Sequence, residues 1–321
     1  MLHLDAEAVH AGLPWPDLVE ALRLAHAARS KPDATTAIFD APDGSGDQFV
    51  NLTAWSGGRS IAVKLVGVFP DNPSRALPEP SIQGLVALFD GATGRPLMTC
   101  DGAALTYRKT AADSALGAAL LSRPDAEVLA IAGAGGLAPF VAEAIAAVRP
   151  VRRILIWNRT RPRAEAMART LRGPGREVTV IDDLDAALPE ADIISAVTMA
   201  TAPVIRGRYL KPGAHVDLIG AYLPTMREAD AETVRRAGRM FCDHRAGFAA
   251  SGDGAAPVAE GLVTGPEADL FDLCTGRHPG RSSREEITVF KNCGGGHLDL
   301  FTAERLYQHQ AATHGRLGLD A

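Results

Sequence analysis

The chain has 321 residues, of which 46% are hydrophobic, and a formal net charge of −5 at pH 7. This length allows one large or two ordinary domains with a sizeable core. The negative charge argues against nucleic acid or an anionic membrane as the main partner. No apolar run approaches the length of a membrane span, and the first residues lack the basic segment of a signal peptide.

Four cysteines lie far apart in the sequence, at Cys100, Cys242, Cys274 and Cys293. Their spacing indicates no disulfide framework, so we expect reduced thiols in a cytoplasmic protein. Neither the cysteines nor the nine histidines follow a metal-ligand pattern, and no metal site is predicted.

The first third of the chain is rich in predicted strands. An amphipathic helix is expected over 15–30. Strands are expected at 48–52, 60–66, 84–90 and 96–100. The residues Gly91-Ala92-Thr93-Gly94 join the last two strands and are a hairpin signal, and a proline-rich loop runs from Pro70 to Pro80. This part is therefore predicted to form an antiparallel sheet.

Helices alternate with strands in the rest of the chain. Helices are expected over 104–122 and 140–148, and strands at 127–132, 153–157, 178–181, 193–196, 215–219 and 240–242. This alternation predicts a parallel, doubly wound sheet, so the fold class is α/β. A last helix is expected over 298–310, beyond the sheet, from where it returns to pack on the first domain.

A glycine-rich turn follows the first of these parallel strands. Gly133, Gly135 and Ala138 fit the pattern G-x-G-x-x-A. The first glycine permits a tight turn, the second lets the backbone approach a pyrophosphate, and the third small residue lets the helix pack on the strand. The motif alone is weak, but the flanking strand, helix and second strand favour a dinucleotide site over an ordinary turn. Hydride transfer is therefore the expected chemistry.

The loop after the second parallel strand bears on the choice of cofactor. It reads Asn158-Arg159-Thr160 and has no Asp or Glu to bind a ribose 2′-hydroxyl. Arg159 can pair with a 2′-phosphate through two N–H donors, which favours NADP(H) over NAD(H), although a solvated loop charge is the plainer alternative. The predicted cofactor contacts are Gly133, Gly135, Gly136, Leu137, Ala138, Asn158, Arg159, Thr160, Arg163, Val197, Thr198, Ile219 and Gly220.

A set of motifs runs along most of the chain in a fixed order. They are Val63-Lys64-Leu65, Phe69-Pro70-Asp71-Asn72, Leu88-Phe89-Asp90, Arg108-Lys109-Thr110-Ala111-Ala112, the Gly133 turn, Gly213-Ala214-His215-Val216 and Arg227-Glu228-Ala229-Asp230. Together they resemble the ornithine cyclodeaminase/mu-crystallin family. The resemblance implies an α+β substrate-binding and dimerisation domain, formed by residues 1–113 with 293–321, and a Rossmann NAD(P)-binding domain over 114–292. It also implies a homodimer.

The activities of this family differ, so the positions at which this chain departs from the family pattern help to choose among those activities. Cyclodeaminases carry an Asp where this chain has Tyr222, and an aromatic residue cannot act as the carboxylate partner of a substrate amine. The resemblance therefore favours the branch that reduces Δ1-pyrroline-2-carboxylate and Δ1-piperideine-2-carboxylate to L-proline and L-pipecolate. Ornithine cyclodeaminase, alanine or imino-acid dehydrogenase, and a non-catalytic NADPH-binding mu-crystallin-like protein stay open as alternatives.

One lysine interrupts an otherwise apolar predicted strand. A buried Lys64 needs an anionic partner, and the carboxylate of a small imino or amino acid substrate would be one; the alternative is a lysine whose head reaches solvent. The resemblance adds Lys109, where the family usually has Arg, and Asp299 at the start of the last helix. The predicted catalytic residues are Lys64, Lys109 and Asp299, and the predicted substrate contacts are Lys64, Arg108, Lys109, Gln83, Tyr222 and His297.

Several of these residues also have a purely structural interpretation. Lys109 can be a solvated charge at a helix start, Asp299 a helix cap, and His297 a structural histidine instead of a proton donor. The family also places an Arg in the N-terminal segment, and residues 34–38 contain none. We therefore expect an altered carboxylate pocket, and no catalytic acid is obvious from the sequence.

Overall fold

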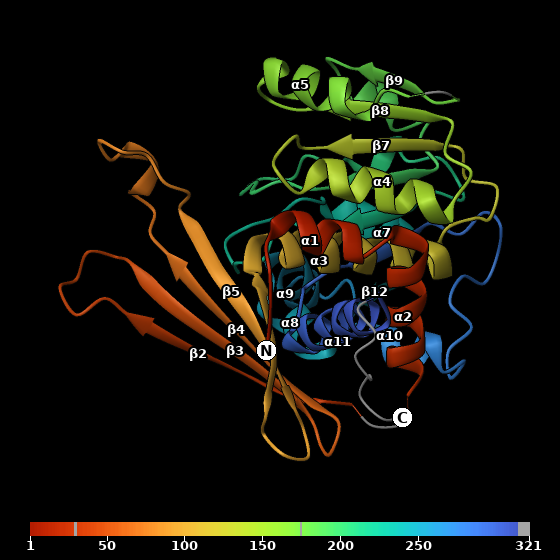
Figure 1. The fold of residues 1–321 in the computed structure, drawn as a ribbon. Coiled ribbons are helices and arrows are strands. Elements are labelled where there is room, and N and C mark those ends of the chain that lie inside the picture. Colours follow the sequence, from red (N-terminus) through yellow and green to blue (C-terminus); the bar gives the residue numbers. More distant parts are fainter. Residues whose placement is uncertain (29–30, 174, 314–321) are drawn as a thin grey trace. The chain divides into compact units, whose positions relative to one another are not determined.

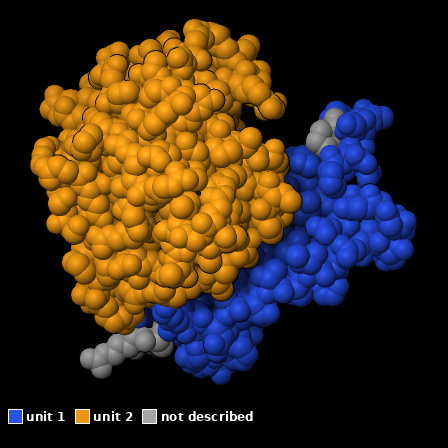
Figure 2. Space-filling model, turned by 180° about the vertical axis from the view of Figure 1, so that it is seen from behind, with its two compact units in different colours: residues 1–109, 295–321 blue, residues 110–294 orange. Residues whose placement is uncertain are grey.

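A computed structural model of the chain describes residues 1–28, 31–173 and 175–313. The chain divides into two compact units, Met1–Lys109 with Gly295–Ala321 (unit 1) and Thr110–Gly294 (unit 2), coloured separately in Figure 2. The domain boundaries predicted from the sequence lie at 113–114 and 292–293. Residues 29 and 30 of the predicted first helix lie outside the described residues.

Unit 1 is built on a six-stranded sheet with the strand order β1-β6-β5-β4-β3-β2. The strands are β1 (Leu2–Leu4), β2 (Asp33–Asp40), β3 (Gln48–Ser56), β4 (Ser60–Val68), β5 (Ile82–Asp90) and β6 (Pro96–Asp101). The predicted strands and hairpin are confirmed, and all neighbours pair antiparallel except β1 with β6. Strands β1 and β2 are not predicted from the sequence. Strand β2 is exposed along its whole length, so no alternation of buried and exposed residues marks it.

The helices of unit 1 are α1 (Ala6–Gly12), α2 (Trp15–Ala27), the short η1 (Asn72–Ser74) and the C-terminal α11 (Gly296–Thr313). Helix α11 packs against β2, β3, β4, β5 and α2, which confirms that the chain end returns to the first unit (Figure 1). Side chains alternate between the two faces of the sheet. Ala54, Ala62 and Val86 are buried on one face, together with Lys64, whereas Phe49 on the other face is exposed.

Unit 2 contains an eight-stranded parallel sheet with the order β13-β12-β14-β11-β10-β7-β8-β9. The strands are β7 (Val128–Ala132), β8 (Arg153–Trp157), β9 (Glu177–Val180), β10 (Ile193–Ala196), β11 (His215–Leu218), β12 (Met240–Cys242), β13 (Ala268–Asp269) and β14 (Thr288–Lys291). The predicted doubly wound α/β fold is confirmed. Two strands are not predicted from the sequence: β13, which is two residues long, and β14, a four-residue strand that ends on a lysine.

Helix α3 (Gly102–Leu121) carries the chain from unit 1 into unit 2. The other helices of unit 2 are α4 (Ala138–Val148), α5 (Arg161–Leu171), α6 (Leu184–Ala187), η2 (Gly207–Tyr209), α7 (Ala231–Ala237), α8 (Arg245–Ala250), α9 (Gly252–Ala259) and α10 (Leu270–Cys274). Within the described residues, no helix has the length and apolar character needed to cross a membrane.

The strand order of unit 2 locates its ligand-binding edge. The chain adds β8 and β9 on one side of β7 and then places β10 on the other side of β7. In open parallel sheets, ligands bind outside the carboxyl ends of the strands where the order reverses in this way. The turn after β7 and the loops after β8, β10 and β11 meet at that edge.

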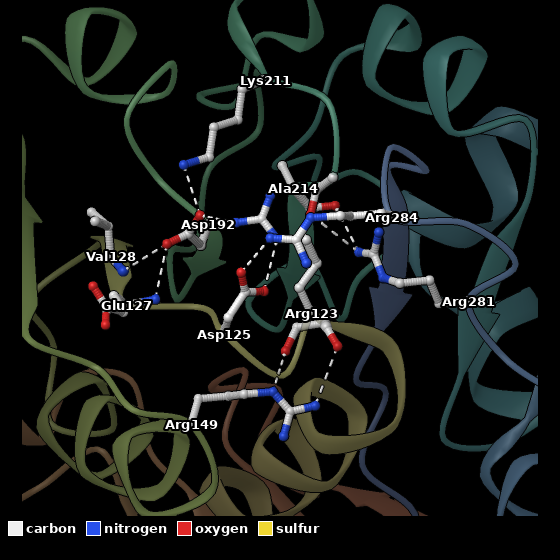
Figure 3. Close-up of polar contacts among 12 residues, drawn as sticks. Arg123, Asp125, Glu127, Val128, Arg149, Asp192, Lys211, Ala214, Arg281 and Arg284 are labelled. Carbon is white, nitrogen blue, oxygen red and sulfur yellow. Dashed lines mark hydrogen bonds and ion pairs between the residues drawn. The ribbon is translucent and has the colours of Figure 1, made fainter.

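The amino ends of the same strands are held by a cluster of arginines and carboxylates (Figure 3). Asp192 accepts hydrogen bonds from the backbone N–H groups of Glu127 and Val128, each at 2.9 Å, and pairs with Lys211 at 2.7 Å and with Arg123. Burial alone would raise the pKa of Asp192, but these donors outweigh it and hold that pKa below its usual value. The start of β7 is therefore anchored at the edge opposite to the glycine turn.

Candidate functional site

The glycine turn after β7 has a backbone that only particular residues permit. Gly133 has a φ of 112°, and a Cβ at this position would lie 2.4 Å from the carbonyl oxygen of Val197. Only glycine fits such a site. A Cβ on Gly135 would meet nothing within 4 Å, so the turn is open on that side. Ala138 is fully buried as the first residue of α4, as close packing of helix and strand requires.

An open cavity of about 380 Å³ lies at the carboxyl ends of β7, β8 and β10. The predicted cofactor residues that line it are Gly133, Gly135, Asn158, Arg159, Arg163, Val197 and Thr198. A neighbouring cavity of about 450 Å³ adds Gly136 and shares Gly135 and Arg163. The structure therefore brings these residues, predicted from separate parts of the sequence, to one place.

The remaining predicted cofactor residues lie at the same edge of the sheet. Leu137 precedes α4, Thr160 precedes α5, and Ile219 with Gly220 follows β11. A Cβ on Gly220 would lie 1.6 Å from the carbonyl oxygen of Thr198. The loops after β10 and β11 are thus in direct contact, and glycine is required between them.

The loop after β8 presents two arginines with unused donors. Asn158 accepts from the N–H of Ala134 at 3.1 Å and so ties this loop to the glycine turn. Within the described chain, the side chains of Arg159 and Arg163 form no ion pair and no hydrogen bond, although both line the cavity. Arg161, by contrast, pairs with Glu165 and with Asp182 and does not line it. The free guanidinium groups can bind an anion there.

A cluster of three charged residues lies in unit 1. Lys64 of β4 and Lys109 of α3 both approach Oδ1 of Asp299 in α11, with their Nζ atoms at 3.5 and 3.7 Å. The three residues are 8%, 5% and 2% exposed. Burial lowers the pKa of Lys64, and Asp299 offsets this only in part. The interpretations of Lys64 as a lysine that reaches solvent and of Lys109 as a solvated charge are therefore wrong.

This cluster is not balanced in charge or in hydrogen bonds. Two ammonium groups face one carboxylate, which leaves an excess of one positive charge. Oδ2 of Asp299 is buried and has no hydrogen-bond partner among the described residues. Uncompensated buried charges and unpaired buried polar atoms are costly, so the cluster is suited to a ligand that brings an anion and a hydrogen-bond donor.

The other predicted substrate residues have different surroundings. Arg108 donates from Nε to Nδ1 of His10 at 3.1 Å and lies 4.1 Å above the ring of Trp15. His297 packs edge-on against the ring of His26, with the ring centroids 5.3 Å apart. These contacts are of the kind that holds helices together, and they do not involve Asp299.

Gln83 and Tyr222 are both exposed side chains. Gln83 donates weakly to the carbonyl of Pro80 at 3.5 Å and lines a separate open cavity of about 750 Å³ in unit 1, beside Phe69 and Asn72. Tyr222 is 55% exposed in the loop after β11 of unit 2. Their roles in substrate binding stay predictions.

Neither Glu228 nor Lys291 is among the residues predicted for the site, and both are fully buried in unit 2. Glu228 accepts hydrogen bonds from the loops after β10 and β11, and burial raises its pKa to about 7. The sequence does mark Lys291 as a buried lysine, because this residue follows the short apolar run Val289-Phe290 as Lys64 follows Ala62-Val63. Glu228 lies in a loop, where no periodicity marks a buried carboxylate.

Comparison with known proteins gives a consistent result. The model of the ornithine cyclodeaminase/mu-crystallin family matches residues 23–314. A Delta(1)-pyrroline-2-carboxylate reductase of Paracoccus denitrificans is 40% identical over 296 residues, 91% of each chain. The ketimine reductase mu-crystallin of Mus musculus is 36% identical over 250 residues, 77% of this chain and 75% of its own. The structure of Thermococcus litoralis Delta(1)-pyrroline-2-carboxylate reductase in complex with NADH and L-proline is 27% identical, with a TM-score of 0.87 and full coverage of both chains.

Two alanine substitutions separate folding from ligand access at the glycine turn. We expect Gly133→Ala to lower the free energy of unfolding by about 1–3 kcal/mol, because its φ and the carbonyl of Val197 exclude a Cβ. Gly135→Ala has room for its methyl group and should unfold like the wild type, yet weaken dinucleotide binding roughly tenfold or more. Thermal unfolding and calorimetric titration with NADPH measure both. Normal NADPH affinity in Gly135→Ala would place the pyrophosphate elsewhere.

Proposed function

Because the chain belongs to the ornithine cyclodeaminase/mu-crystallin family, we propose that it reduces a cyclic ketimine acid to a cyclic amino acid with NAD(P)H. The substrate is Δ1-pyrroline-2-carboxylate or Δ1-piperideine-2-carboxylate, and the product is L-proline or L-pipecolate. The observation that carries this proposal is the buried cluster of Lys64, Lys109 and Asp299, with its excess positive charge and a carboxylate oxygen that no described residue contacts by a hydrogen bond. The identity to named reductases of this class supports it.

A cyclic ketimine acid in its reactive form complements this cluster. Its carboxylate is an anion, which the ammonium groups of Lys64 and Lys109 can bind as point charges. Its protonated ring nitrogen is a donor, which Oδ2 of Asp299 can accept in a charge-assisted hydrogen bond. Asp299 then contacts both lysines through Oδ1 and stabilises the proton on the imine nitrogen through Oδ2. A protonated imine is the more electrophilic form, and a carboxylate beside the nitrogen favours that form. Asp299 therefore raises the fraction of bound substrate that can accept hydride at the adjacent carbon.

The nucleotide edge of unit 2 fits a nicotinamide dinucleotide. When bound, the cofactor supplies the hydride. The pyrophosphate would be held by the backbone of Gly133 and Gly135 and by the N-terminus of α4. The proton stays on the substrate nitrogen and becomes an N–H of the product amine. Ornithine cyclodeamination would instead require a carboxylate where the chain has Tyr222.

We infer that NADPH is preferred to NADH. Arg159 and Arg163 line the cavity, and their guanidinium groups have no partner in the described parts of the chain. The loop after β8 has no carboxylate that would bind a ribose 2′-hydroxyl and repel a phosphate. A guanidinium can donate two parallel hydrogen bonds to a phosphate. These properties support a 2′-phosphate site on this loop.

We also infer that the chain forms a homodimer through the outer face of the unit 1 sheet. Phe39, Phe49, Trp55 and Leu85 share this face, on the side opposite to Lys64, and are 58%, 46%, 51% and 42% exposed. Phe39 and Phe49 are direct cross-strand neighbours. Exposed large apolar side chains on one sheet face favour association, and a second copy would cover the same residues on both chains by two-fold symmetry.

Removal of the Lys64 ammonium tests the catalytic cluster. In Lys64→Met, we expect kcat/KM for Δ1-pyrroline-2-carboxylate to fall roughly 100-fold or more, because the carboxylate loses a buried cation. The affinity for NADPH should stay unchanged, since the cofactor residues belong to unit 2. Loss of NADPH absorbance in steady state and calorimetric NADPH binding measure the two quantities. Asp299→Asn should behave in the same way, and an equal loss of NADPH binding in either variant would contradict the assigned role.

The cofactor preference can be tested with a matched pair of arginine variants. We expect Arg159→Ala to weaken NADPH binding roughly 10- to 100-fold and to leave NADH binding unchanged, because only the 2′-phosphate contact is lost. Arg161→Ala is the control, since its guanidinium is already paired with Asp182 and Glu165. Equal effects of Arg159→Ala on both nucleotides would remove the basis for an NADPH preference.

Sedimentation velocity tests the dimer. The wild-type protein should sediment as a dimer at micromolar concentration, and Phe49→Lys should shift it toward the monomer because a charge replaces apolar surface at the interface. Leu24→Lys is the control, because Leu24 is 56% exposed on α2 and outside this face. A monomeric wild type would refute the dimer, and an undisturbed Phe49→Lys dimer would place the interface elsewhere.

A further inference from the structure

Two oppositely charged residues lie beneath the loops at the carboxyl ends of β10 and β11. Glu228 and Lys291 are both fully buried in unit 2. Neither lines the cavity at the glycine turn, and neither takes part in the chemistry proposed above. Charged side chains are almost never fully buried unless they are paired or hydrogen-bonded.

The Glu228 carboxylate joins both loops. Its Oε1 accepts from the N–H of Thr198 at 2.7 Å and from the O–H of Thr198 at 2.8 Å. Its Oε2 accepts from the N–H groups of Gly220 at 2.7 Å and Ala221 at 3.3 Å. One side chain therefore satisfies donors from the loop after β10 and from the loop after β11.

Lys291 holds the same turn from the other side. It ends β14, next to β11, and its Nζ donates to the carbonyl oxygens of Leu218 at 3.2 Å and Ile219 at 3.1 Å. The carbonyl groups of residues 218–219 thus bind the ammonium of Lys291, and the N–H groups of residues 220–221 bind the carboxylate of Glu228. Because Gly220 also touches the backbone of Thr198, a shift of one loop forces a shift of the other.

We propose that Glu228 and Lys291 are positioning residues for the nicotinamide half of the cofactor. The inference rests on the proposed function. In a sheet of this order, the strands on the β7–β9 side hold the adenosine half, and those on the β10–β11 side hold the nicotinamide half. Thr198, which Glu228 fixes, lines the cavity. The adenosine half would be held by the glycine turn and Arg159, which Glu228 does not contact.

The hydrogen bonds by which Glu228 and Lys291 hold the two loops, called the clamp below, depend on the ionised form of Glu228. Only a carboxylate can accept from all four donors, because an amide or a protonated acid would turn a donor toward one of the N–H groups. Burial raises the pKa of Glu228 to about 7. Lys291 from β14 opposes this rise, and Asp253 from α9, which accepts from the N–H of Glu228 at 2.9 Å, adds to it. The clamp is therefore intact above neutral pH and weakens as the pH falls through that value.

The experiment compares two ligands that differ only in the nicotinamide. NADPH carries both halves of the cofactor, and 2′-phospho-ADP-ribose lacks the nicotinamide. In Glu228→Gln, we expect the Kd of NADPH to rise roughly tenfold while that of 2′-phospho-ADP-ribose changes less than about twofold, by calorimetry at about pH 8. Glu260→Gln is the matched control, because Glu260 pairs with the neighbouring Arg227 but is exposed.

A structural role alone would weaken both ligands equally or leave both unchanged, and either result would overturn the proposal. If Glu228→Gln does not fold, the wild-type protein decides: between about pH 8 and pH 6 the Kd of NADPH should rise more steeply than that of 2′-phospho-ADP-ribose, and parallel curves would refute the clamp. Lys291→Met should reproduce the selective loss. A wild type that binds neither ligand would instead refute the proposed function.

Discussion

The carboxylate of Asp299 is the interaction on which the organisation of unit 1 depends. Two ammonium groups cannot be buried beside each other without an anion, and no other carboxylate is paired with Lys64 or Lys109 among the described residues. Asp299 lies on α11, almost 200 residues after Lys109 in the sequence. The chain therefore passes through all of unit 2 before it returns to unit 1 with the residue that completes the cluster. The C-terminal helix is part of the candidate site, and not only a cover for the sheet.

Unit 2 also contains buried charges that need partners, but there the partners are of a different kind. Glu228 and Lys291 are buried charges whose partners are mainly backbone groups, so they act on the shape of two loops and not on a ligand directly. In unit 1 one oxygen of Asp299 has no hydrogen-bond partner among the described residues, whereas in unit 2 both oxygens of Glu228 accept hydrogen bonds and the ammonium of Lys291 donates two. This contrast separates residues that are suited to bind substrate from residues that are suited to hold a loop.

The sequence predicted those features that have a local signature. The Gly133 turn and the strand at Ile193–Ala196 were found because tight turns and short apolar strands leave a pattern within a few residues. Lys64 was found because it breaks an apolar run. Strand β2 was missed because it is exposed throughout, and Asp299 was assigned only by resemblance, since its contact with Lys64 joins residues 235 positions apart. Contacts of that range carry no local pattern.

The lysine at position 109, where the family usually has Arg, has a physical consequence for the site. A guanidinium can bind a carboxylate through two parallel N–H donors and would then occupy both oxygens of Asp299. The ammonium of Lys109 contacts Oδ1 alone, at 3.7 Å, and Oδ2 stays without a hydrogen-bond partner among the described residues. In the proposed function, Lys109 therefore binds a substrate carboxylate only as a point charge, but it leaves Oδ2 of Asp299 as an acceptor for a protonated ring nitrogen. A cyclic iminium acid uses both the cations and this acceptor, whereas a ligand without an N–H donor would leave Oδ2 buried and unpaired.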